Sequence, residues 1–170
     1  MTASSKANKP KKPTIDYVEK RLLANAIVTF TKNGGITVFG VAFPGNATPP
    51  DFNDFFENFW ALPRKFGDYV RTTLVLNKQA RLKVKGGNHY VADQYSMKAV
   101  HVKGIAQEDL LYVTDANSVR ESFVFGPEKI NTNGSGPAVV AQYGHGRIGY
   151  LGNVNNEEES QVLLFAMLSS

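Results

Sequence analysis

The chain has no cysteine among its 170 residues. Disulfide bonds, cysteine-ligated zinc and a cysteine nucleophile are therefore excluded. Long hydrophobic runs are also missing, because no apolar stretch approaches the ~20 residues that a membrane-spanning helix needs. The first residues, MTASSKANKPKKPT, contain no apolar core of a signal peptide. We therefore expect a protein of the cytoplasm, with the nucleus as the alternative, and no membrane partner.

Outside the first 14 residues, basic and acidic residues balance, so the rest of the chain carries no net charge. The net charge of +4 comes from four lysines in that segment: Lys6, Lys9, Lys11 and Lys12. A nucleic-acid-binding domain usually carries its basic field on the folded surface, so we do not expect a nucleic-acid partner. We predict that residues 1–13 form a disordered basic tail and that residues 14–170 form a single domain.

The first part of the domain reads as a helix followed by a buried strand. Thr14 is suited to cap the helix, whose apolar residues recur at close to helical spacing: Ile15, Val18, Leu22, Ala26 and Phe30. Gly34 and Gly35 end it. The next run, ITVFGVAF from Ile36 to Phe43, is apolar on both faces, as expected of a central strand covered by helices on each side.

A second helix is predicted after Thr48. Thr48 is the cap, Pro49 fits the first helical position, and Asp51 stands where a capping box has its acid. Five aromatic residues then share one face: Phe52, Phe55, Phe56, Phe59 and Trp60. This stripe predicts a helix packed on a sheet, with a ligand platform or partner groove as the alternative.

The remaining segments alternate short strands with turns. Strand patterns cover Asp68–Leu76, residues 81–85, Met97–Ile105 and residues 122–125, and residues 106–113 read as a short helical turn. Residues 130–137 are rich in turn residues. The closing helix, NEEESQVLLFAML, places four apolar residues where they can pack on the sheet: Val162, Leu163, Phe165 and Ala166.

The segment Gly144–Gly149 matches the dinucleotide-binding fingerprint G-x-G-x-x-G. In that fingerprint the glycines lead directly into a helix whose N-terminus faces the pyrophosphate. Here a strand pattern follows, and the helix starts only after Asn153, with three glutamates in its first turn that would repel a phosphate. We therefore predict a hairpin turn at Gly144-His145-Gly146 and no dinucleotide cofactor.

The residues that could carry chemistry are few. The three histidines show no ligand spacing, so we expect no metal site, and we expect no cofactor. Tyr69 and Arg71 alternate to the same face of their strand, where Arg71 could clamp a carboxylate or phosphate, or pair with Asp68 or another acid. We take five residues as candidate ligand-binding residues and assign none as catalytic: Tyr69, Arg71, His101, Asn153 and Asn155.

Two stretches, ALPRKFGDYVRTT and GHGRIGYLGNVNNEEES, joined by YSMKAV, resemble blocks of uncharacterised fungal proteins. The helix, Gly-Gly, strand block and the late hairpin are similar to the glutamine amidotransferase-like, or ThuA-like, α/β fold. The resemblance covers residues 15–168. This chain departs from the family pattern at Arg64, Val70 and Asn153, where tryptophan, histidine and aspartate would be expected, and it lacks the cysteine nucleophile of class I amidotransferases.

The resemblance implies an α/β fold and no established activity. We predict a single three-layer α/β domain, with a mixed but mostly parallel sheet, helices on both faces and a late antiparallel hairpin. Family members begin with a strand and a helix, so this chain is expected to be a shortened copy whose strand Ile36–Phe43, or its neighbour, leaves an exposed edge that drives self-association.

From the same residues and resemblance we predict a non-catalytic binding or scaffold domain for a small molecule or a protein that the sequence does not identify. The alternative is a hydrolase-like enzyme whose site lies near Arg71, His101 and Asn153.

Overall fold

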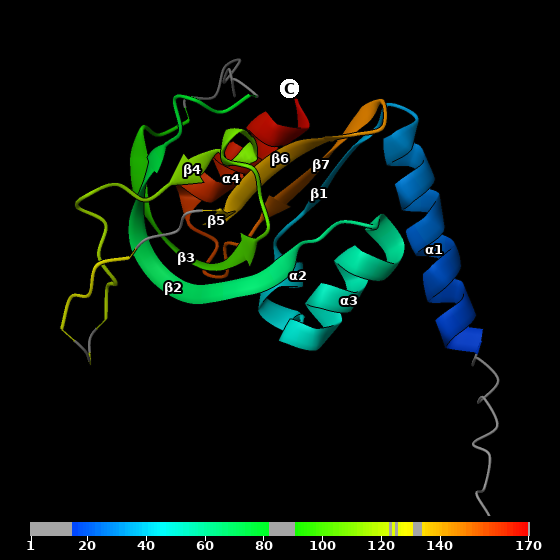
Figure 1. Ribbon diagram of the computed structural model, residues 1–170, viewed down its shortest axis with the longest axis horizontal. Coiled ribbons are helices and arrows are strands. Elements are labelled where there is room, and N and C mark those ends of the chain that lie inside the picture. The colour runs from blue at the N-terminus through cyan, green and yellow to red at the C-terminus, as the bar shows by residue number, and fades with distance from the viewer. Residues whose placement is uncertain (1–14, 82–90, 123, 125, 131–133, 170) are drawn as a thin grey trace, which may run out of the picture.

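Two small β-sheets form the centre of the molecule (Figure 1). The computed structural model describes residues 15–81, 91–122, 124, 126–130 and 134–169, with side chains from Glu19 onward. The first sheet has the order β1 (Ile36–Phe39), β7 (Gly146–Leu151), β6 (Ala138–Tyr143). The second has the order β4 (Tyr112–Val113), β2 (Lys65–Leu76), β3 (Gln94–Lys103), β5 (Ser135–Gly136).

The predicted fold class, one mostly parallel three-layer sheet, is wrong. The pairing of β1 with β7 is parallel, but the other strand pairings are antiparallel, and the second sheet is antiparallel throughout. Parallel neighbours need long crossover connections, usually through a helix. Between β2 and β7, the only helical element in the part of the chain that the structure describes is the short 3-10 turn η1 (Gln107–Asp109), so the strands there pair antiparallel.

Helices cover both faces of the first sheet. On one face α4 (Glu158–Leu168) packs Leu163 and Met167 against alternate residues of the strands, including Val140 and Leu151. The opposite face holds Ile148 and Tyr150 and is covered by α1 (Ile15–Lys32) and α3 (Pro49–Trp60). The long, curved strands β2 and β3 run beside this unit (Figure 1). None of the described helices is long and apolar enough to cross a membrane.

Helix α3 forms as its sequence predicts. The backbone N–H of Asp51 donates to Thr48 Oγ1 at 3.4 Å, and Pro49 occupies the first turn. Its aromatic stripe is buried at Phe52, Phe56 and Trp60, whereas two further members are only half-buried: Phe55 and Phe59. The packing prediction is therefore confirmed for the inner part of the stripe.

Two apolar runs near the N-terminus are placed differently from the prediction. The strand predicted to reach Phe43 ends at Phe39, because a turn at Val41, with φ of 56°, leads into the short helix α2 (Ala42–Asn46). In α1 the members of the predicted stripe whose side chains the structure describes lie on the outer surface: Ala26 is exposed, Leu22 is 64% exposed and Phe30 is 58% exposed. The helix instead packs through Val28 and Thr31.

The hairpin prediction is confirmed. Strands β6 and β7 are joined by the two residues Gly144 and His145, and Gly144 has φ of 62°. A Cβ atom on Gly146 would lie 2.1 Å from the carbonyl oxygen of Gly35. The glycines of the fingerprint thus permit a turn that packs its backbone directly on the end of α1.

Other predictions have mixed outcomes. The closing helix forms, but Phe165 is 58% exposed and is therefore not buried against the sheet. The predicted helical turn at residues 106–113 is η1 followed by β4. Three predicted features lie wholly or largely outside the described residues: the tail at 1–13 with the Thr14 cap, the strand at 81–85, and the strand at 122–125.

Strand β1 lies at the edge of its sheet. Within the described residues it pairs with β7 and with no second strand. The predicted exposed edge is therefore consistent with the structure, although the strand is only four residues long.

Candidate functional site

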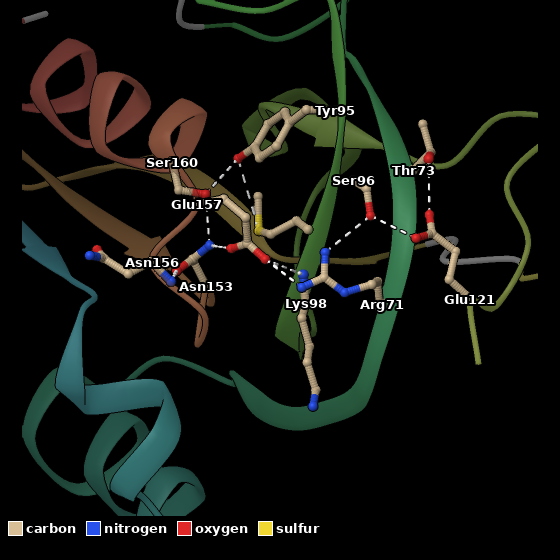
Figure 2. A network of polar contacts seen from close by, with 11 residues as sticks. Arg71, Thr73, Tyr95, Ser96, Lys98, Glu121, Asn153, Asn156, Glu157 and Ser160 are labelled. Carbon is tan, nitrogen blue, oxygen red and sulfur yellow. Dashed lines mark hydrogen bonds and ion pairs between the residues drawn. The ribbon is translucent and has the colours of Figure 1, made fainter. Parts of the chain in front are cut away.

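A network of polar side chains connects the second sheet to the start of α4 (Figure 2). Strand β2 contributes Arg71, and β3 contributes Tyr95, Ser96 and the backbone of Lys98. The segment after β7 contributes Asn153 and Glu157, and the first turn of α4 contributes Ser160. Strand pairing sets Arg71 directly opposite Lys98, so these two residues of the network lie next to each other on neighbouring strands.

The carboxylate of Glu157 is the centre of the network. Arg71 Nη2 lies 2.8 Å from Glu157 Oε1, and the backbone N–H of Lys98 donates to the same oxygen at 3.3 Å. Asn153 Nδ2 donates to Glu157 Oε2. The side chain of Glu157 is 15% exposed, and its charge is satisfied by three donors from three different segments. A carboxylate bound in this way fixes the position of the helix start.

Asn153 holds the turn that precedes α4. Its side chain is buried, its Nδ2 donates to Ser160 Oγ at 2.9 Å, and its Oδ1 accepts from the backbone N–H of Asn156 at 2.7 Å. Ser160 Oγ also contacts the hydroxyl of Tyr95 at 3.1 Å. Burial raises the pKa of Tyr95, which keeps the phenol neutral. These polar groups are hydrogen-bonded to one another. A buried polar network stabilises a specific fold only when its members are satisfied in this way.

The arrangement offers little to a substrate. A general base or a nucleophile needs a face that a reacting atom can approach. In this network Arg71, Glu157 and Asn153 are all engaged in contacts within the protein. Arg71 also donates from Nη1 to Ser96 Oγ at 3.3 Å. The network is therefore a structural clamp between β2, β3 and α4.

The five predicted site residues do not converge. Arg71 and Asn153 meet through Glu157. Tyr69 is 52% exposed, with Lys98 Nζ 5.2 Å from the centre of its ring, and Asn155 is exposed. His101 is fully buried, and neither of its ring nitrogens has a hydrogen-bond partner among the described residues.

Sequence reasoning missed the role of Glu157. Its position in a run of three glutamates at a helix start predicts a solvated residue, and the nearest acid to Arg71 in the sequence is Asp68. The structure instead sets Asp68 near Lys103, at 3.8 Å, and joins Arg71 to Glu157. One available signal is the spacing of Asn153 and Glu157, which lets both side chains meet across the turn before α4.

A second feature is a groove between α1 and α3. It has a volume of about 450 Å³, and its walls are almost entirely apolar. From α1 come Leu23, Ala24 and Ile27, and from α3 come Phe55 and Phe59. The half-buried outer members of the aromatic stripe therefore line this groove, which is the alternative that the sequence left open for them.

Comparison with protein-family models, curated sequences and solved structures finds no match for this chain. The resemblance to uncharacterised fungal proteins of the amidotransferase-like group stays a prediction.

Proposed function

We propose that this chain is a non-catalytic binding domain and that the groove between α1 and α3 is its binding site. The observation that carries this proposal is the apolar lining of a surface groove of about 450 Å³. Ligand sites in proteins are typically concave, of several hundred Å³, and lined by hydrophobic and aromatic side chains. Phe55 and Phe59 are half-buried without a ligand, so an apolar occupant would remove further aromatic surface from water.

The polar residues favour binding over catalysis. A hydrolase-like site would need Arg71, His101 and Asn153 to face one cleft. Instead, Arg71 and Asn153 are bound within the clamp around Glu157. Burial lowers the pKa of His101 to about 4, and the imidazole is enclosed in the protein. These positions support the binding domain against its enzymatic alternative.

The shape of the groove indicates the class of ligand. It runs between two helices, and such a groove accommodates the apolar face of a further helix, in the manner of helix-in-groove recognition. We therefore propose a protein surface as the ligand, and the cytoplasm, with the nucleus as the alternative, as the compartment in which it is bound.

An apolar fluorescent dye tests whether the groove binds. The probe is anilinonaphthalene sulfonate, followed by energy transfer from Trp60, which lines the groove and is the single tryptophan of the chain. We expect saturable binding at one site. Ala24→Phe should abolish it, because the added ring fills the groove from its α1 wall.

The matched control is Ala26→Phe, which adds the same ring to an exposed position on the same helix. Dye binding that the two variants reduce equally, or that neither reduces, would contradict the proposal. Far-UV circular dichroism of each variant establishes that the fold is retained.

A further inference from the structure

Strand β2 contains a β-bulge opposite His101. The register of β2 against β3 shifts between Phe66 and Tyr69. Two residues of β2, Gly67 and Asp68, therefore stand opposite one residue of β3, His101. The ladder of backbone hydrogen bonds is interrupted at such a bulge. Gly67 permits the close approach of the two strands, because a Cβ atom at this position would lie 2.7 Å from the carbonyl oxygen of His101.

On its other side, the end of β3 is flanked by β5, which lies at the edge of the second sheet (Figure 1). This strand has only two residues, Ser135 and Gly136, which pair with Lys103 and Val102. His101 therefore lies between an interrupted ladder and a very short edge strand. Segments that few backbone hydrogen bonds hold in place are the ones that open locally while the rest of a protein stays folded.

Buried polar atoms without partners collect at this place. Both ring nitrogens of His101 and the hydroxyl oxygen of Ser135 are buried and have no hydrogen-bond partner among the described residues. Ser135 lies opposite Lys103, which is two residues along β3 from His101. Residues two apart on a strand share a face of the sheet, so the side chains of His101 and Ser135 lie on the same face. Because buried polar groups without a hydrogen bond are destabilising, an opening that hydrates them is favoured here.

Two charged side chains act on the imidazole. Burial lowers the pKa of His101; the carboxylate of Asp68 on β2 opposes this shift, and the charge of Lys103 on β3 adds to it. Asp68 and Lys103 are both exposed, with Asp68 Oδ1 3.8 Å from Lys103 Nζ. Lys65, which lies opposite Lys103 on β2, is paired with Glu57, and β5 contains no charged residue. The carboxylate available to a protonated His101 is therefore that of Asp68.

We propose that the bulge at Gly67 and Asp68 is a proton-sensitive hinge: protonation of His101 separates the bulge and β5 from the end of β3, and the imidazolium then pairs with Asp68. The proton comes from solvent and is added to a ring nitrogen. Asp68 exchanges its contact with Lys103 for one with His101, and the exposed lysine stays hydrated. The first sheet and its helices remain closed.

The size of the response follows from the environments of the imidazole in the two forms. In the open form it is hydrated and has the ordinary histidine pKa near 6.5, whereas burial in the closed form lowers its pKa to about 4. As the pH falls through 6.5 the proton binds only the open form, and opening becomes more favourable until the pH approaches 4. Between pH 7.5 and pH 5 the equilibrium constant for opening should rise about 30-fold, and the ion pair with Asp68 increases this factor further.

Hydrogen exchange of the full-length chain, followed by mass spectrometry at pH 7.5 and pH 5, tests the hinge. After correction for the intrinsic effect of pH on exchange, the amides of residues 101–103 should lose protection by about 30-fold or more at pH 5. Low concentrations of urea should not change this exchange, because a local opening exposes little surface. The amides of β7 should stay better protected at both pH values. Equal protection of β7 and residues 101–103 at pH 5 would overturn the proposal, since the whole fold then opens together.

Three variants identify the groups involved. His101→Gln should abolish the loss of protection at pH 5, and a wild-type response in this variant would overturn the assignment of the proton to His101. Asp68→Asn should reduce the response, and an unchanged response would overturn the ion pair of the open form. Asp54→Asn is the matched control, because it makes the same replacement at an exposed position on α3, and it should respond like the wild type. Asp68 is exposed, so Asp68→Asn tests the hinge even where His101→Gln does not fold.

Discussion

The buried imidazole of His101 makes the stability of this protein depend on pH. The side chain is fully buried, and neither ring nitrogen has a partner among the described residues. Burial lowers its pKa to about 4; the carboxylate of Asp68 opposes this shift, and the charge of Lys103 adds to it. The unfolded chain has an ordinary histidine pKa near 6.5. Between these two values the unfolded state therefore binds a proton that the folded state excludes.

The magnitude follows from the difference between the two pKa values. At neutral pH both states hold a neutral imidazole, and the effect is small. As the pH falls through 6.5 the free energy of unfolding decreases, by about 2 kcal/mol at pH 5. The loss approaches about 3 kcal/mol below pH 4, where the folded state also becomes protonated and the effect levels off. Acid thus destabilises the fold through this residue.

Urea denaturation across a pH series measures the effect. His101→Gln, which has no titrating group, should unfold with a flatter pH dependence between pH 7 and pH 5, by about 2 kcal/mol relative to the wild type. His101→Leu is the second variant, because it also removes both unpartnered ring nitrogens. His145→Gln is the control, since His145 is exposed at the hairpin turn, and it should follow the wild type. Equal slopes for wild type and His101→Gln would refute the reasoning.

Three further predictions concern stability and are checked by urea or thermal unfolding. Gly146→Ala should lower the free energy of unfolding by about 3 kcal/mol, because its Cβ would overlap a backbone oxygen. Gly126→Ala, with open space around it, should leave the free energy of unfolding nearly unchanged. Equal losses for the two variants would contradict the packing argument. Phe56→Ala should cost about 3–5 kcal/mol because Phe56 is fully buried; a stable variant would mean that the site collapses without a cavity. Asn153→Ala should cost about 2 kcal/mol by leaving its partners unpaired, and an unchanged midpoint would show that the clamp contributes nothing.

Two local sequence signals, a helix start and a hairpin turn, predicted the structure correctly. Thr48 and Pro49 identify the start of α3, because capping depends on residues within one turn. The glycines at Gly144 and Gly146 identify the hairpin, because their backbone requirements are local as well. Both features are present in the structure.

Features that depend on distant contacts were not predictable in the same way. The apolar spacing in α1 indicates one apolar face of the helix, but it does not show whether another part of the same chain buries that face. In the structure Leu22 and Phe30 of this face lie on the surface. Strand patterns give no direction of pairing, so the antiparallel second sheet was missed. The contact between Arg71 and Glu157 joins segments that are far apart in sequence, and charge alone does not choose among the acids of the chain.

The pairing of β1 with β7 has a consequence for the order of events during synthesis. Ile36 pairs with Arg147, so most of the chain must leave the ribosome before the first sheet can close. Until then α1, β1 and α3 have no β7 to pack against, although Val28 and Phe56 share their core cluster with Ile148 and Tyr150. Sheets built from such distant partners fold slowly. We therefore expect the nascent chain to expose the aromatic residues of α3 until β6 and β7 emerge, and to complete this core only then.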